Sequence, residues 1–124
     1  MKFFCKFLLQ ASLCLFLTLP VVSSEAFWWD KVKAPKYTEE MFDNVAGKGK
    51  YVFIEFFTKG CGFCEQFYPE FNKVYDEFTG TNALRDDILI IKIDGEEDSN
   101  VAHRYGVGSF PTFILLYPND YIFP

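Results

Sequence analysis

The chain has 124 residues and a formal net charge of −5, and half of its residues are hydrophobic, with an aromatic fraction of 20%. This length supports one domain, and the apolar content is ample for a core. With 12 basic residues against 17 acidic ones and no basic stripe, the charge pattern argues against binding to nucleic acid or to anionic lipid.

The first 24 residues predict a secretory signal peptide. Lys2 and Lys6 precede an apolar run from Phe7 to Val22, and small residues follow, which is the order of such a leader. Cleavage after Ser24 and cleavage after Ala26 fit equally well. The alternative is an uncleaved membrane anchor, but the run of about 16 residues is shorter than the roughly 20 that span a bilayer. No later segment of the sequence is long and apolar enough to do so.

Loss of this leader would change the cysteine content of the chain. Cys5 and Cys14 lie within it, so that the mature chain would keep only Cys61 and Cys64. Secreted domains that depend on disulfides usually carry several cysteines spread along their length. A single close pair therefore favours a chemical role. Without the leader, about ten basic residues would face seventeen acidic ones.

The remaining chain predicts alternating helices and strands. Residues 25–36 form an N-terminal segment whose aromatic residues are expected to pack on a domain spanning residues 37–124. Thr38 is a candidate N-cap of a short helix, which the following glycines end. Tyr51–Phe57 is apolar nearly throughout, which is typical of a strand buried on both faces.

The second half of the chain continues this alternation. The stretch from Cys61 to about Thr79 predicts an amphipathic helix, and Ile88–Asp94 predicts a second buried strand. A short helix capped by Asp98 or Ser99 follows, and Thr112–Tyr117 predicts a third strand. Two buried strands joined by a helix form a parallel, right-handed βαβ unit. The cysteines then lie where the first strand passes into its helix.

That position favours redox chemistry at Cys61 and Cys64. A thiolate at a helix N-terminus is stabilised by unpaired amides and by the positive end of the helix dipole, which can lower its pKa toward about 7. Cys61 is therefore the candidate nucleophile, and Cys64 is the candidate resolving thiol that releases a mixed disulfide. The alternatives are an inert disulfide and part of a metal site. A metal site needs about four ligands, and only His103 joins the two cysteines.

Four segments, in one order, resemble the thioredoxin-fold superfamily and especially the catalytic domains of the protein disulfide isomerase family. They read FIEFFTKGCGFC, EQFYPEF, KIDGEEDSNVAHRYGV and SFPTFILLY. The resemblance implies an α/β thioredoxin fold, with a central mixed sheet and helices on both faces. It also implies an enzyme that forms, reduces or isomerises disulfides in proteins of the secretory pathway, in the endoplasmic reticulum lumen or after secretion. The expected partners are cysteine-containing client proteins and glutathione or another thiol, and no cofactor is implied.

The resemblance assigns roles to two charged residues in the predicted strands. Glu55 matches the family's buried acid, which is thought to move protons to and from the resolving Cys64. Burial within an apolar strand would independently raise the pKa of this carboxyl unless it is paired. Lys92 matches the lysine that pairs with that acid. The alternative is that Glu55 or Lys92 lies at an exposed strand end.

Further roles concern the residues beside the cysteines. Pro111 matches the family's cis-proline, packed against the disulfide, and Phe110 before it would supply backbone hydrogen bonds to the substrate. Between the cysteines, Gly62 and Phe63 replace the Gly-His usual in the isomerases, and Glu65 adds a negative charge. These changes are expected to raise the pKa of the attacking thiol. The reduction potential should then lie between about −270 mV for thioredoxin and −180 mV for the isomerase.

The last residues depart from the resemblance. After the third predicted strand, a turn at residues 118–120 leads into Tyr121–Pro124, so that the family's last strand and helix are expected to be missing. The missing helix would leave an apolar face of the sheet bare. The chain is then expected to be an incomplete gene product, or a partner is expected to cover that face. This departure also leaves a second function open, a binding or chaperone-like thioredoxin-fold module with little turnover.

Overall fold

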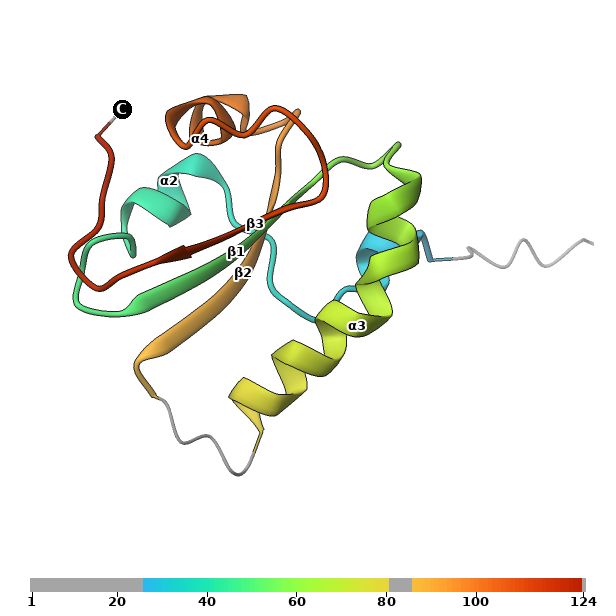
Figure 1. Ribbon diagram of the computed structural model, residues 1–124, viewed down its shortest axis with the longest axis horizontal. Coiled ribbons are helices and arrows are strands. Elements are labelled where there is room, and N and C mark those ends of the chain that lie inside the picture. Colours follow the sequence, from blue (N-terminus) through green and yellow to red (C-terminus); the bar gives the residue numbers. More distant parts are fainter. Residues whose placement is uncertain (1–25, 81–85, 124) are drawn as a thin grey trace, which may run out of the picture.

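The computed structural model describes residues 26–80 and 86–123, and Figure 1 shows a central sheet with helices on both faces. The elements are η1 (Trp28–Lys31), α2 (Glu39–Asp43), β1 (Tyr51–Phe57), α3 (Gly62–Thr79), β2 (Ile88–Asp94), α4 (Ser99–Arg104) and β3 (Thr112–Leu116). The expected signal peptide, with Cys5 and Cys14, lies outside the described residues. Within the described part of the chain, no helix is long and apolar enough to cross a membrane.

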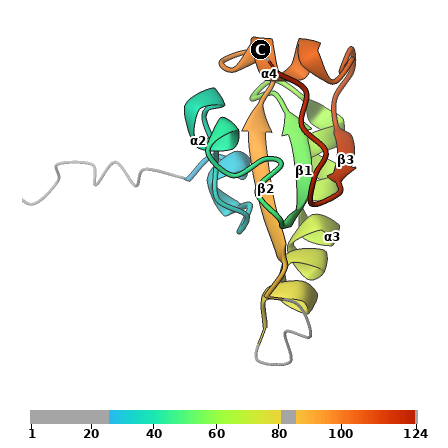
Figure 2. The ribbon, with the colours of Figure 1, turned by 90° about the vertical axis from the view of Figure 1, so that its left-hand side faces the viewer.

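The sheet has the order β2-β1-β3, and Figure 2 shows β1 between its two neighbours. β2 runs parallel to β1, whereas β3 runs antiparallel to it. The first two strands have the predicted bounds, and β3 ends one residue earlier than expected. The fold is therefore the predicted α/β thioredoxin fold with a mixed sheet. This topology places the C-terminal ends of β1 and β2 and the N-terminal end of β3 at the same end of the sheet.

Alternate residues of β1 contribute to two separate cores. Val52, Ile54 and Phe56 are buried in a cluster that includes Phe42 of α2. On the opposite face, Phe53 packs against Phe71 of α3, with 6.1 Å between the ring centroids. Side chains of a strand alternate between the two faces of its sheet, so that Glu55 and Phe57 share the face of Phe53. This is the face that α3 and η1 cover (Figure 1).

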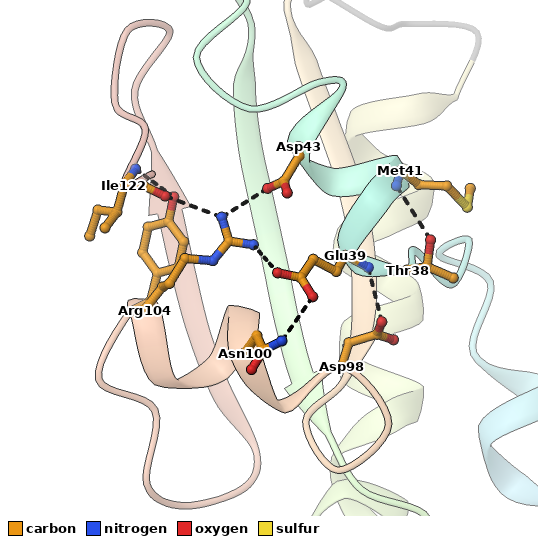
Figure 3. A network of polar contacts seen from close by, with 9 residues as sticks. Thr38, Glu39, Met41, Asp43, Asp98, Asn100, Arg104 and Ile122 are labelled. Atoms are coloured by element: carbon orange, nitrogen blue, oxygen red, sulfur yellow. Dashed lines mark hydrogen bonds and ion pairs between the residues drawn. The ribbon is translucent and has the colours of Figure 1, made fainter. Parts of the chain in front are cut away.

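A polar network joins α2 and α4 over the first of these cores (Figure 3). The guanidinium of Arg104 donates hydrogen bonds to Asp43 at 2.8 Å and to Glu39 at 3.2 Å. It also donates to the backbone carbonyl of Ile122 at 3.2 Å. The Thr38 hydroxyl caps α2, as predicted, by accepting from the N–H of Met41. Charge-assisted hydrogen bonds of this kind are among the stronger ones in proteins, and here they attach both short helices to the residues after β3.

Residues 27–37 form what we call the N-terminal strap, which runs from η1 across one edge of the sheet. Val32 and Ala34 are buried in the core beneath α3. At its far end the strap pairs with β2 through a parallel bridge between Lys36 and Lys92. The backbone N–H of Lys92 donates to the carbonyl of Pro35, and the N–H of Tyr37 donates to the carbonyl of Lys92. The strap is thus packed into the domain.

The outer edge of β3 carries no further strand in the part of the chain that the structure describes. Residues 121–123 lie outside regular secondary structure. They turn back across the domain, where a Cβ at Gly47 would lie only 2.8 Å from the Cβ of Tyr121. Gly47 also has a positive φ of 68°, so that both its conformation and this close approach require glycine.

Candidate active site

The two cysteines lie at the start of α3, in the loop that leaves β1. Cys61 is the N-cap residue of α3, and Cys64 lies in its first turn. The two sulfurs are joined in a disulfide, with the Cα atoms 5.2 Å apart. The backbone N–H of Cys64 donates to the Sγ of Cys61 at 3.1 Å. An amide of the helix N-terminus therefore points at the sulfur predicted to be the nucleophile.

The two sulfurs differ in their access to solvent. Cys61 is half-buried, whereas Cys64 is fully buried. Between them, Gly62 is exposed and the side chain of Phe63 is 74% exposed. A large partner can therefore approach Cys61 and Phe63 from outside, while Cys64 is covered by its own domain.

The Phe110–Pro111 peptide bond lies at the same edge of the sheet and is cis, as the resemblance implied. Thr112, the next residue, pairs with Phe56 near the end of β1. The ring of Phe110 lies over Gly95, where an added Cβ would be 2.3 Å from the ring. The Phe110 ring is thus directed toward the loop after β2.

Glu55 is fully buried in the middle of β1. Among the described residues, neither of its carboxylate oxygens has a hydrogen-bond partner. Burial raises the pKa of the Glu55 carboxyl to about 7, and the charge of Lys92 lowers it only in part. A carboxyl with such a pKa can take up and release a proton near neutral pH.

Lys92 lies opposite Glu55 in the parallel register of β1 and β2, but its ammonium group bonds elsewhere. It donates to the backbone carbonyl of Trp29 at 2.6 Å and to that of Val32 at 3.0 Å. Burial lowers the pKa of Lys92, and the charges of Glu55 and Asp30 raise it. Lys92 thus lies beside Glu55 and acts on it by charge, while its hydrogen bonds go to the strap carbonyls.

A group of ion pairs beside the cysteines was not predicted from the sequence. Glu97, in the loop after β2, accepts hydrogen bonds from Lys59 of the cysteine loop and from Lys36 of the strap. These hydrogen bonds lower the pKa of Glu97 to about 2. Trp28 adds a further tie, because its indole N–H donates to the carbonyl of Lys59 at 3.3 Å. The sequence could have indicated the contact between Lys59 and Glu97. Both residues follow parallel strands, and the loops that follow parallel strands lie at the same end of a sheet.

The family profile described as thioredoxin matches residues 33–123. The chain belongs to the thioredoxin family. Its described residues carry a cysteine pair at the CxxC spacing, His103 is exposed on α4, and no group of three or more potential metal-ligating side chains occurs among them.

Curated relatives of this thioredoxin-family chain include both isomerases and thioredoxins. A probable protein disulfide-isomerase A6 of Medicago sativa is 33% identical over 87 residues, which cover 70% of this chain and 22% of that protein. The chloroplastic thioredoxin Y of Oryza sativa subsp. japonica is 34% identical over 87 residues, which cover 69% of this chain and 48% of that protein. The chain therefore spans less than half of the length of these relatives.

Solved structures share the fold. A thioredoxin of Malassezia sympodialis superposes with a TM-score of 0.60 at 29% identity, over 71% of this chain and 73% of that chain. The zinc-bound form of human ERp44 superposes with a TM-score of 0.61 at 19% identity, over 69% of this chain and 23% of that chain. The second likeness shows the fold alone.

The unequal access of the cysteines predicts unequal reactivity. After reduction of the disulfide, iodoacetamide at neutral pH should alkylate Cys61 roughly tenfold faster than Cys64, because the more accessible thiol at the helix N-terminus has the larger thiolate fraction. Peptide mass mapping at successive times measures both rates in one sample. Cys61→Ser and Cys64→Ser variants give the rate of each remaining thiol alone. Equal rates, or faster labelling of Cys64, would contradict the assignment of the two thiols.

The raised pKa of Glu55 predicts a pH-dependent stability. The folded-state pKa is about 7, against an ordinary value of 4.5, so that the folded protein binds more protons than the unfolded chain between these values. Stability must then fall as pH rises through this window. Relative to Glu55→Gln, the free energy of unfolding of the disulfide form should fall by about 3 kcal/mol across it, at 1.36 kcal/mol per pKa unit. Urea titrations at several pH values measure it, and parallel pH profiles of the two proteins would refute the assignment.

Proposed function

We propose that the chain is a protein thiol–disulfide oxidoreductase that acts through Cys61 and Cys64. In the reducing direction, the Cys61 thiolate attacks one sulfur of a client disulfide and the client S–S bond breaks. That sulfur is now bonded to Cys61 in a mixed disulfide, and the other client sulfur leaves as a thiolate. Cys64 then loses its proton and attacks the sulfur of Cys61, which releases the second client thiolate. The client gains two electrons and the chain becomes the Cys61–Cys64 disulfide. The reverse sequence oxidises a client dithiol.

The geometry of the Cys61 sulfur carries this proposal. Cys61 is the less buried cysteine of the pair, and its sulfur accepts the Cys64 N–H at 3.1 Å at the N-terminus of α3. A negative charge on this atom is stabilised by that hydrogen bond and by the helix dipole. Cys64 is buried, which suits a thiol that reacts with its neighbour and not with solvent thiols. An inert structural disulfide would need neither property.

Glu55 is the group that we assign to proton transfer with Cys64. It lies on the α3-covered face of β1, on the same side of the sheet as the first turn of α3. Its pKa of about 7 matches the neutral pH at which a general acid–base group exchanges protons best. Lys92 acts on Glu55 through its charge. In this assignment Glu55 accepts the Cys64 proton during reduction of a client and returns it during oxidation.

We assign client binding to the residues around the sulfurs. The backbone at Phe110, before the cis Pro111, can hydrogen-bond an extended client segment. The exposed Phe63 ring offers an apolar contact beside Cys61. Together these groups would hold a peptide across the nucleophilic sulfur, and Gly62 leaves room for its backbone.

The proposal extends to the secretory pathway and to a role like that of the protein disulfide isomerases. The leader pattern of the sequence and the isomerase relatives support this location, in the endoplasmic reticulum lumen or after secretion. The thioredoxins among the relatives support a thioredoxin-like role instead. The reduction potential of the Cys61–Cys64 pair distinguishes the two roles, because thioredoxin and the isomerase differ by about 90 mV.

Reduction of insulin by dithiothreitol tests the proposed activity. The purified chain should accelerate precipitation of the insulin B chain, because the reduced Cys61 attacks the insulin disulfides faster than dithiothreitol does. Cys61→Ser should abolish the acceleration, and Lys73→Ala, which removes only an exposed ion pair on α3, should leave it unchanged. Binding of unfolded insulin without acceleration would support the chaperone-like alternative instead.

Phe63 should set the potential of the pair. Replacing Phe63 with His introduces a residue that can stabilise the Cys61 thiolate by charge and hydrogen bonding, which favours the dithiol form. The reduction potential should therefore rise by some tens of millivolts toward the isomerase value. Equilibration with glutathione buffers measures it. Phe63→Leu, which is apolar like Phe63, should leave the potential nearly unchanged, and an unchanged potential in Phe63→His would show that another group controls it.

A further inference from the structure

The side chain of Asn72, in the middle of α3, holds the backbone of the N-terminal strap at two adjacent points. Its Oδ1 accepts the N–H of Lys33 at 2.7 Å, and its Nδ2 donates to the carbonyl of Lys31 at 2.9 Å. These two bonds bracket Val32, the residue between them. The carboxamide therefore fixes the position and the rotation of the Val32 peptide groups.

The carbonyl of Val32 is one of the two that bind Lys92. The ammonium of Lys92 reaches it from β2 at 3.0 Å, and it reaches the carbonyl of Trp29 at 2.6 Å. Residues 31–33 of the strap are thus held by Asn72 from the helix and by Lys92 from the sheet. If Asn72 lost its hold, the Val32 carbonyl could turn away from Lys92.

We propose that Asn72 is a positioning residue of the active site: by fixing the strap to α3, it keeps the Lys92 ammonium on the strap carbonyls and away from the Glu55 carboxyl. Lys92 and Glu55 are partners in the parallel register, and neighbouring strands lie about 4.8 Å apart, so that the ammonium can reach the carboxylate once the carbonyls release it. The proposal rests on the proposed function, because it makes the strap control the proton affinity of the residue assigned to Cys64.

Other titratable groups near Glu55 and Lys92 lie on η1, on the strap, on β2 and on α3. Asp30 of η1 raises the pKa of Lys92 and Lys36 of the strap lowers it, both by charge. Asp94, on the same face of β2, accepts from the backbone N–H groups of Glu96 and Glu97. On α3, Tyr68 and Tyr75 pack against the core beneath the helix, and the exposed Asp76 pairs with Lys33. Among the described charged side chains, Lys92 is the one whose charge acts on Glu55.

Titration of Glu55 in the oxidised protein tests the proposal directly. The cysteines do not titrate in the disulfide form, so that the chemical shift of the Glu55 side-chain carboxyl carbon reports its own protonation in a ¹³C NMR titration. The wild-type midpoint should lie at about 7. In Asn72→Ala it should fall by about one pH unit or more, because an opposite charge within 4–6 Å lowers a carboxyl pKa by roughly 1–3 units. Asn72→Leu, which keeps the volume of the side chain, should show the same fall and serves if the alanine variant folds poorly.

A double-mutant cycle separates the effect of Lys92 from entry of water beneath the strap. Lys92→Met alone should raise the Glu55 midpoint, since it removes the attractive charge. In the Lys92→Met background, Asn72→Ala should no longer lower the midpoint, because no ammonium is left to move. A fall of equal size in both backgrounds would overturn the proposal, since solvation of Glu55 would then explain it. An unchanged midpoint in both Asn72 variants would overturn it as well.

Lys33→Ala is the matched control. It removes the exposed side-chain ion pair between strap and helix but keeps the backbone N–H that Asn72 accepts, so that the midpoint should stay at the wild-type value. A fall as large as that in Asn72→Ala would show that any loosening of the strap suffices and would overturn the specific role of Asn72. The insulin assay separates this inference from the proposed function. Shifted midpoints without insulin reduction would sink the function alone, whereas reduction with unshifted midpoints would sink the inference alone.

Discussion

The pairing of β1 with a strand on each side is the constraint on which the rest of the domain depends. β1 is parallel to β2 and antiparallel to β3, and helices cover both of its faces (Figure 1). Its backbone groups are therefore satisfied within the sheet, and its side chains must be apolar or be buried at a cost. Because the chain leaves β1 directly into the cysteine loop, the same pairing fixes where Cys61 lies relative to Pro111 and to the loop after β2.

Glu55 of β1 and Lys92 of β2 are two buried charged residues in this otherwise apolar sheet, and the fold treats them unequally. The buried ammonium of Lys92 receives two backbone carbonyls from the strap, whereas the carboxyl of Glu55 receives no hydrogen bond from the described residues. A buried carboxyl without a partner is more stable in its neutral form. The result is one satisfied cation beside an acid whose proton is exchangeable near neutral pH. A close ion pair would instead have kept the acid charged.

The sequence predicted the sheet and the position of the cysteines well, because runs such as ILIIKID are apolar over a length typical of buried strands. Hydrophobic periodicity likewise predicted α3 to within one residue at its start. The environment of Lys92 could not be predicted in this way. Its partners are backbone carbonyls of Trp29 and Val32, and any residue type carries such a group, so that no sequence pattern marks them. The same holds for Asn72, a polar residue on an amphipathic helix that looks like an ordinary surface position.

Under the proposed function, the two thiols depend on different parts of the fold. Cys61 relies on the first turn of α3, whose amide at Cys64 points at its sulfur, and this hydrogen bond forms within that turn. Cys64 relies on Glu55, whose proton affinity depends on burial and on Lys92. A change at Asn72 therefore acts on the proton transfer at Cys64 through Lys92, whereas the hydrogen bond to the Cys61 sulfur is made by α3 itself. The attacking and resolving steps thus depend on different groups, because one is controlled by a helix end and the other by the packing of the strap beneath that helix.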